Sequence, residues 1–310
     1  MPSERADTGH VEFVEPSELL NLFSGPSFTV VDCRRILRCG LLPLSVVLRY
    51  KEKESFEQAI ERALDHLMYT APPEDNTVAL VVDHKGSESG EEAVDMKLVA
   101  AYLRQNTGCE RVVRILGGAR ALAESHRFLF SLSQASAANL PSQLGPTLFL
   151  GATVTALDVK LLTGLGINCV VSVLRRKLIL EHIAEGRHTV VRPTALAGSA
   201  AVDVRALLDE TLPFILDALE ASEGGKVLVH GEEGNEATAT AVACAALVAD
   251  GSTQLSLEQA AEHIVSCRPS ASLPPEILEQ LKGCEAWLSD GAPPQQLFDQ
   301  TVEGRDTEGE

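Results

Sequence analysis

The residues with the clearest chemical meaning lie between positions 226 and 248. A short apolar strand, expected over 226–229, runs into a glycine-containing turn, and an alanine-rich helix is expected over 237–248. Where a strand, a tight turn and a helix N-terminus meet, unpaired backbone N–H groups and the positive end of the helix dipole converge. The pattern therefore predicts a loop shaped to hold an anion. A Walker-type nucleotide loop fits poorly, because no Gly-Lys-Ser/Thr follows.

The side chains of this loop supply no group that reacts with a phosphate ester. The loop reads His230, Gly231, Glu232, Glu233, Gly234, Asn235, Glu236, Ala237 and Thr238. Its three glutamates place carboxylates where a dianion would bind. One like-charge contact at about 4 Å, with an effective dielectric constant of ~20, costs on the order of 4 kcal/mol. Attraction to the helix dipole returns only about 0.3–1 kcal/mol. We therefore expect the loop to repel phosphate.

In this frame the loop resembles that of the dual-specificity protein phosphatases, which reads His-Cys, five residues, Arg, then Ser or Thr. His230, Gly234 and Thr238 match the pattern, but Gly231 stands at the position of the nucleophile and Ala237 at that of the Arg. Attack on phosphorus needs a thiolate, which glycine lacks, and a bidentate cation, which alanine cannot replace. The resemblance thus implies a loop that has lost its reactive groups.

A third loss concerns the general acid that protonates the leaving group. Phosphatases of this type carry an Asp on a loop before the strand, and the resemblance places that loop over 188–201. This segment contains neither Asp nor Glu, and Ser199 or Ala200 falls near the position of the acid. Asp203 lies just beyond the segment, so this loss is less sharply defined than the other two.

Further segments extend the resemblance beyond what a generic strand–turn–helix unit would give. Ser256 and Gln259 form the pattern of a capping box before an amphipathic helix, and Cys267-Arg268-Pro269 ends that helix. A last helix is expected from 274 to about 287. Strands expected over 145–151 and 167–173 are similar to the first two strands of those phosphatase domains. Together the match covers roughly half of the chain.

The first 130 residues alternate β-branched strands with amphipathic helices, which predicts a parallel sheet. Expected strands cover 28–34, 78–82 and 112–118, and expected helices cover 55–69, 92–105 and the residues from 119 onward.

The Asp-Cys-Arg strand end at 32–34 and Leu-Gly-Gly-Ala at 116–119 resemble a rhodanese-type domain. Sulfurtransferases of that family carry their cysteine after the strand that is here 78–82. This chain has no cysteine there but reads Asp83, His84, Lys85 and Gly86. We expect Cys33, within a buried strand, to be an inert small hydrophobic residue.

We therefore predict an α/β protein of two domains. A rhodanese-like parallel-sheet domain is expected over 11–130, a linker over 131–143, and a catalytically inactive dual-specificity-phosphatase-like domain over 144–290. An acidic, disordered tail is expected over 291–310.

Composition excludes several classes of function. The chain has 310 residues, a net charge of −18 and a pI near 4.9, which disfavours nucleic acid and anionic membranes as partners. Aromatic residues make up only 4%, too few for stacked recognition of bases or sugars. The seven cysteines show neither Cys-x-x-Cys nor metal-ligand spacing, so we expect reduced thiols and neither metal nor cofactor. With no apolar leader or membrane span in the sequence, the expected location is cytoplasmic.

Two basic clusters stand out in so acidic a chain. A rhodanese-type domain ahead of a dual-specificity phosphatase domain is the layout of the MAP kinase phosphatases, whose first domain docks the kinase through a basic cluster beside apolar residues. The resemblance implies protein partners such as MAP kinases or other phosphatases. The candidate docking residues are Arg34, Arg35 and Arg38 in one cluster and Arg49, Lys51 and Lys53 in the other.

With both nucleophile positions empty, the chain resembles the STYX-type pseudophosphatases, which also carry Gly after His in this loop. The resemblance implies a catalytically inactive signalling scaffold or regulator. Two alternatives stay open. One is an enzyme that uses unconventional groups, such as Asp83 with His84 or His230 with Glu233. The other is a structural adaptor unrelated to MAP kinases.

Overall fold

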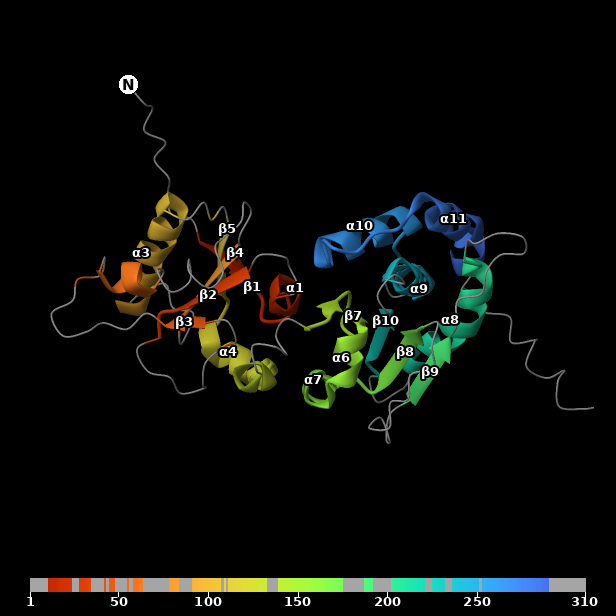
Figure 1. The fold of residues 1–310 in the computed structure, drawn as a ribbon, viewed down its shortest axis with the longest axis horizontal. Coiled ribbons are helices and arrows are strands. Elements are labelled where there is room, and N and C mark those ends of the chain that lie inside the picture. The colour runs from red at the N-terminus through yellow and green to blue at the C-terminus, as the bar shows by residue number, and fades with distance from the viewer. Residues whose placement is uncertain are drawn as a thin grey trace, which may run out of the picture.

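The computed structural model contains two five-stranded sheets that follow one another along the chain (Figure 1). The structure describes residues 11–23, 28–34, 42, 45–47, 55, 58–63, 78–83, 91–106, 109, 111–132, 139–174, 187–191, 202–220, 225–231, 236–250 and 253–289. Statements about the structure refer to these residues.

The first sheet has the strand order β1-β5-β4-β2-β3, and every described pairing in it is parallel. Its strands are β1 (Glu12–Val14), β2 (Phe28–Asp32), β3 (Ser45–Val47), β4 (Val78–Val82) and β5 (Arg111–Ile115). The accompanying helices are α1 (Leu19–Phe23), α3 (Glu91–Asn106), α4 (Gly118–Ser125) and the 3₁₀ helix η1 (Arg127–Ser131).

The second sheet has the order β6-β7-β10-β8-β9 and is parallel except for β6, which pairs antiparallel with β7. Its strands are β6 (Ser142–Gln143), β7 (Leu148–Ala152), β8 (Cys169–Val173), β9 (Arg187–Val191) and β10 (Val227–Gly231). Its helices are α6 (Thr153–Leu157), α7 (Val159–Leu165), α8 (Val204–Glu220), α9 (Glu236–Ala249), α10 (Leu257–Cys267) and α11 (Pro275–Ser289).

Successive side chains of a strand point to opposite faces of the sheet, and the buried apolar residues accordingly form three clusters. In β10, Val227 and Val229 pack with α8, α9, α10 and α11, whereas Leu228 points to the opposite face. In β4, Val81 packs with α3, whereas Leu80 and Val82 point the other way. The residues that point away from the outer helices of both sheets meet in one middle cluster, together with α1, α4, α6 and α7. Parallel strands buried on both faces explain the almost continuous apolar runs in the sequence.

Most predicted elements are confirmed with boundaries shifted by a few residues. The strand expected over 78–82 is β4, and the helix expected over 237–248 is α9. The capping box forms: the Ser256 hydroxyl accepts from the Gln259 N–H at 3.3 Å, and the Gln259 side chain accepts from the Ser256 N–H at 3.0 Å. Of the helix expected over 55–69, residues 58–63 are helical and most of the others lie outside the described residues.

The segment predicted as a linker, 131–143, is folded at both described ends. Ser131 belongs to η1, Leu140 is buried, and Ser142 and Gln143 form β6. Residues 133–138 and the expected tail over 291–310 lie outside the described residues. The α/β class with largely parallel sheets is confirmed, whereas the domain boundaries and the rhodanese-like assignment stay predictions.

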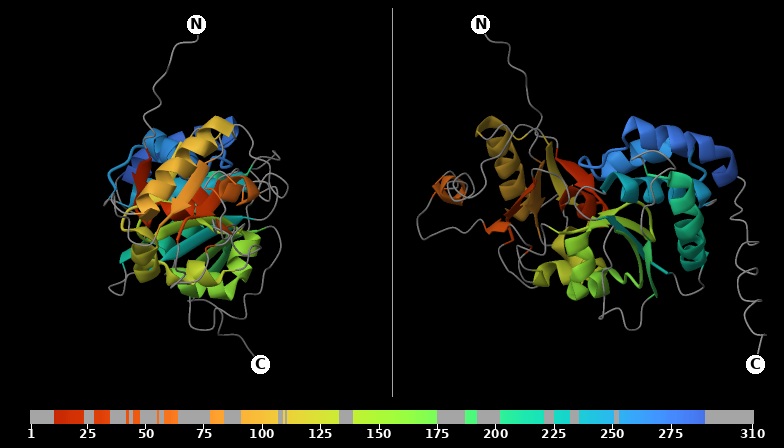
Figure 2. Two further views of the ribbon diagram at one scale, coloured as in Figure 1. Left: turned by 90° about the vertical axis from the view of Figure 1, so that its left-hand side faces the viewer. Right: turned by 45° about the vertical axis from the view of Figure 1, so that its right-hand side comes forward.

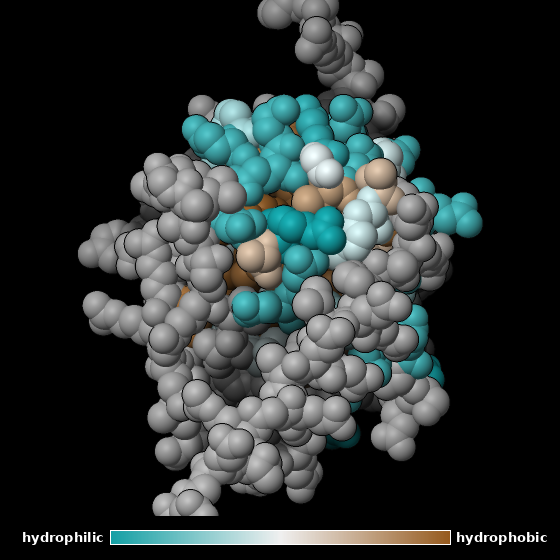
Figure 3. Space-filling view, turned by 90° about the vertical axis from the view of Figure 1, so that its right-hand side faces the viewer, coloured by the Kyte–Doolittle hydropathy of each residue, from teal (hydrophilic) through white to brown (hydrophobic). Residues whose placement is uncertain are grey.

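The surface near α8 and α11 is mainly hydrophilic, with smaller apolar areas between the polar residues (Figure 3). On these helices Arg205 forms an ion pair with Asp209, and its guanidinium carbon lies 3.9 Å from the centre of the Trp287 ring. Among the described helices, none is long and apolar enough to cross a membrane.

Candidate functional site

Strand β10 places the candidate phosphate loop at the centre of the second sheet. It lies between β7 and β8, and its last residue, Gly231, is level with Ala152 of β7 and Val173 of β8. Helix α9 then begins at Glu236. The strand end and the helix start predicted for an anion-binding loop are thus present, with residues 232–235 between them lying outside the described residues. Glu232, Glu233, Gly234 and Asn235 are therefore not placed.

His230 is locked inside the sheet. Its side chain is fully buried, and its Nε2 lies 2.6 Å from the hydroxyl oxygen of Ser172, the residue level with it on β8. Both partners are 0% exposed, so a substrate could reach neither of them without opening the sheet. This arrangement disfavours the alternative in which His230 acts with Glu233 as a general base.

The backbone of Gly231 is fixed from the neighbouring helix. The Thr153 hydroxyl, at the start of α6, donates a hydrogen bond to the Gly231 carbonyl at 2.9 Å. Because glycine carries no side chain, this well-positioned residue offers neither a nucleophile nor a proton acceptor toward the loop.

The start of α9 presents a carboxylate and no cation. Glu236 is exposed in the first helical turn, where its charge is favourable to the helix dipole. Ala237 is half-buried and Thr238 is buried. The position that would hold a phosphate-binding arginine thus bears a methyl group, and the free end of the helix already has a negative charge of its own.

Arg268 is a charged neighbour of this region, although the sequence pattern indicated it only as part of a helix end. Burial lowers the pKa of Arg268, and attraction to Glu236 partly opposes that shift. Its Nη1 also lies 3.4 Å from the Ser142 hydroxyl. The charge of the guanidinium is therefore within electrostatic range of a carboxylate of the protein itself. The sequence signal that could have identified Arg268 is its position directly after the helix that begins with the capping box.

No described cysteine offers a substitute thiolate near the loop. The six described cysteines are free and buried. Burial raises the pKa of Cys244 to about 12 and also raises that of Cys267. Cys267 Sγ lies 3.6 Å from His263 Nε2, but that nitrogen lies only 2.7 Å from the Leu144 carbonyl, to which it can only donate. His263 therefore cannot take the proton of the Cys267 thiol through this nitrogen.

Several solved structures are similar to about half of this chain. Human DUSP28 is 27% identical, with 48% of this chain and 94% of that protein covered and a TM-score of 0.41. A mouse putative dual-specificity phosphatase complexed with zinc tungstate is 24% identical, covering 50% and 92%, with a TM-score of 0.41. The human tyrosine phosphatase-like serine/threonine/tyrosine-interacting protein is 23% identical, covering 47% and 96%, with a TM-score of 0.40.

These neighbours are dual-specificity phosphatase domains and a relative of them. No protein-family model and no curated protein sequence matches the chain.

In the first sheet, the expected vestigial site begins at the end of β4. Asp83 is buried, and its Oδ2 accepts a hydrogen bond from Arg114 Nη2 at 3.0 Å. His84, Lys85 and Gly86 lie outside the described residues, so the pair Asp83–His84 is not tested. Cys33 is buried, as expected for a small hydrophobic residue in a strand end.

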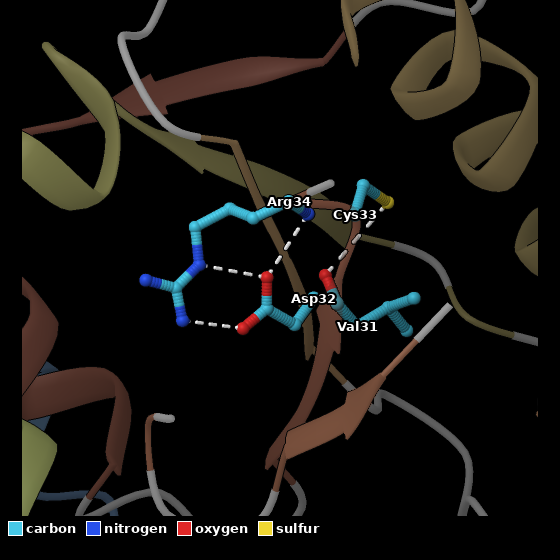
Figure 4. Close-up of polar contacts among 4 residues, drawn as sticks. All are labelled: Val31, Asp32, Cys33 and Arg34. Carbon is cyan, nitrogen blue, oxygen red and sulfur yellow. Dashed lines mark hydrogen bonds and ion pairs between the residues drawn. The ribbon is translucent and has the colours of Figure 1, made fainter. Parts of the chain in front are cut away.

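The structure corrects the prediction that Arg34 is a docking residue. Arg34 is only 2% exposed and forms a two-pronged ion pair with Asp32, with Nε 2.8 Å from Oδ1 and Nη2 2.6 Å from Oδ2 (Figure 4). Its backbone N–H also donates to Asp32 Oδ1 at 3.1 Å. A charge held inside the protein by its own carboxylate cannot dock a partner. The other candidate docking residues, Arg35, Arg38, Arg49, Lys51 and Lys53, lie outside the described residues.

Among the described residues, no group of three or more His, Cys, Asp or Glu side chains is arranged to hold a metal ion.

Proposed function

We propose that this chain is a catalytically inactive, dual-specificity-phosphatase-like protein that acts by binding protein partners in signalling. The observation that carries the proposal is the pair of residues on either side of the candidate loop. Gly231 ends strand β10 and Ala237 lies in the first turn of α9. Phosphate-ester cleavage by this route needs a thiolate at the first position and a guanidinium at the second.

Electrostatics supports loss of phosphate binding as well as loss of turnover. Glu236 occupies the exposed first turn of α9, and the sequence places Glu232 and Glu233 directly before it. A protein that trapped phosphorylated substrates would need to keep its affinity for the phosphate group. We therefore propose that partners bind without inserting a phosphate into this loop.

The partners we propose are MAP kinases or other phosphatases, as in the MAP-kinase-phosphatase-like member of the STYX-type pseudophosphatases. The proposal includes a rhodanese-like first domain whose reactive position, from Asp83 to Gly86, is likewise empty of cysteine. Because Arg34 is buried, the proposed docking surface is reduced to Arg35, Arg38, Arg49, Lys51 and Lys53. We propose a cytoplasmic location.

Inactivity is tested by assaying the purified chain with p-nitrophenyl phosphate and with thiosulfate plus cyanide. We expect no turnover above that of a buffer blank. Phosphatase or sulfurtransferase activity that persists after all seven cysteines are replaced by serine would contradict the proposal, because it would require a nucleophile other than a thiol.

The partner class is tested separately by surface plasmon resonance with purified MAP kinases. We expect binding that is lost in the Arg49→Glu/Lys51→Glu double variant and retained in Arg120→Glu, whose exposed side chain pairs only with Glu124 on the same helix in the described contacts. Equal binding of wild type and double variant would remove the proposed docking surface, and no binding at all would remove MAP kinases as partners.

A further inference from the structure

The two sheets are joined by contacts between residues that lie far apart in the sequence. The Asn21 side chain, on α1, donates through Nδ2 to the Gln143 carbonyl at 2.9 Å and accepts through Oδ1 from the Gln143 N–H at 2.7 Å. These residues are 122 positions apart. The amide thus pairs with the outer strand β6 as the backbone of a neighbouring strand would. We call this pair the clasp.

A second contact between the two halves comes from η1. A Cβ added to Gly164 of α7 would lie 2.6 Å from Cγ of Phe128, so the aromatic ring rests directly on the helix backbone. On the other side of η1, the Phe130 ring lies 5.6 Å from the guanidinium carbon of Arg34, at the end of β2. Leu129, between them, is fully buried. We call residues 128–130 the wedge.

The wedge and the helix that carries Asn21 belong to one apolar cluster to which both halves contribute. Leu19, Leu20 and Phe23 come from α1, and Phe149 and Leu161 come from the second half. All five are nearly or fully buried. Separating the halves would expose this cluster to water, which is unfavourable in proportion to its apolar area.

The pictures agree with this arrangement. In Figure 1, α1 lies where the two sheets meet, and η1, which follows α4, contacts α7 below it. The right-hand view of Figure 2 also shows the first half of the chain lying against the second half. Lys226, which precedes β10, donates from Nζ to the Leu165 carbonyl at 2.8 Å. Its charge contributes to lowering the pKa of His126, at the end of α4 in the first half. The junction therefore combines buried apolar side chains with the polar contacts of the clasp.

We infer that the two sheets form one cooperative folding unit, joined by the clasp and the wedge, rather than two domains that move independently on a flexible connection. This inference does not rest on the proposed function. If the proposed function is correct, the inference implies in addition that partners bound to the two sheets are held in a fixed position relative to each other.

The chain carries separate natural probes for its two halves. Trp287, the single tryptophan, lies on α11, and the buried thiols of Cys33 and Cys109 lie in the first half. Unfolding in urea can therefore be followed by Trp287 fluorescence and, in the same samples, by pulse labelling of Cys33 and Cys109 read by mass spectrometry. For a cooperative unit the two transitions of the wild type coincide.

Three variants sharpen the test. Ser256→Ala removes the helix cap at the start of α10, where the first turn contacts Glu285 of α11 in the second half. In a single unit it shifts both transitions to lower urea by the same amount. Gly164→Ala forces a methyl group against Phe128, and we expect it to lower both midpoints and to separate them. Gly283→Ala is the matched control, since nothing lies within 4 Å of the Cβ it adds to α11, and it should leave the transitions coincident.

Asn21→Ala provides a second junction variant that adds no atoms, for use if Gly164→Ala does not fold. It should separate the transitions in the same way. Transitions that already differ in the wild type would overturn the inference. So would a Ser256→Ala shift seen only by Trp287, or junction variants that behave like Gly283→Ala.

Discussion

His230 Nε2 and the Ser172 hydroxyl oxygen lie 2.6 Å apart between two central strands, and neither side chain is exposed. In a hydrolase a serine so close to a histidine would suggest a nucleophile with its base. Here the pair ties β8 to β10 at the level where the candidate loop begins. His230, the first residue of the loop, is thus a structural residue, which agrees with the absence of reactive side chains at positions 231 and 237.

Ser172→Ala should destabilise the protein by about 1–3 kcal/mol, because His230 Nε2 would lose its buried hydrogen-bond partner. The measurement is the free energy of unfolding in urea. Ser266→Ala is the control, since the Ser266 hydroxyl is exposed and bonds only to backbone and a neighbouring thiol among the described contacts. Its effect should stay within about 0.5 kcal/mol. Similar values for the two variants would refute the structural role of the pair.

Gly231→Cys alone should not create a phosphatase. The new thiol would lack an arginine at position 237 and would lie close in sequence to Glu232, Glu233 and Glu236, whose charges disfavour a thiolate. The measurement is hydrolysis of p-nitrophenyl phosphate, together with titration of the new thiol by iodoacetamide. We expect it to react only at higher pH than the thiol of Gly283→Cys on α11.

Weak hydrolysis should need Ala237→Arg as well, with the nearby glutamates replaced. Efficient hydrolysis by the single Gly231→Cys variant would show that the loop does not need an arginine at position 237, contrary to the phosphatase pattern.

Breaking the ion pair of Asp32 and Arg34 should be costly. Arg34→Met leaves a buried carboxylate without its cation, and loss of one partner of such a pair costs about 3–5 kcal/mol. The matched comparison is Arg111→Met. Its partner is Glu12, and the two side chains are 45% and 48% exposed, so the loss should be about 0–1 kcal/mol. Thermal unfolding measures both, and equal losses would mean that Arg34 is not buried in solution.

Stability should fall as the pH drops below about 6.5, in part through His126. Burial, and to a smaller extent the charge of Lys226, lower the pKa of His126 below its ordinary value of 6.5. The unfolded chain therefore binds the proton more readily, and protonation below pH 6.5 favours unfolding. His126→Gln should reduce the slope of unfolding free energy against pH. An unchanged slope would show that His126 titrates alike in both states.

Local signals in the sequence predicted most of the elements. β-branched runs followed by glycine identify β5 and β10, and the Ser256–Gln259 pair marks the first residue of α10, since these patterns depend on neighbours within a few positions. The empty positions of the candidate loop also followed from residue identity, because glycine and alanine cannot carry the missing groups wherever they lie.

Other features depend on contacts that no local pattern reveals. Arg34 was taken for a surface charge because it begins a basic run, whereas its orientation is decided by a carboxylate two residues earlier that turns it inward. The clasp joins Asn21 to Gln143, and nothing near either residue indicates the other. Arg268 comes within electrostatic range of Glu236 because α9 and α10 pack together.

The clasp has one more consequence, which concerns association between copies of the chain. Strand β6 is very short and antiparallel, and the Asn21 amide already takes up both polar groups of the Gln143 backbone. Open strands at the margin of a sheet invite pairing with another molecule, and short or covered ones resist it. At this edge of the second sheet, α1 of the first half therefore prevents β6 from pairing with a strand of another copy of the chain.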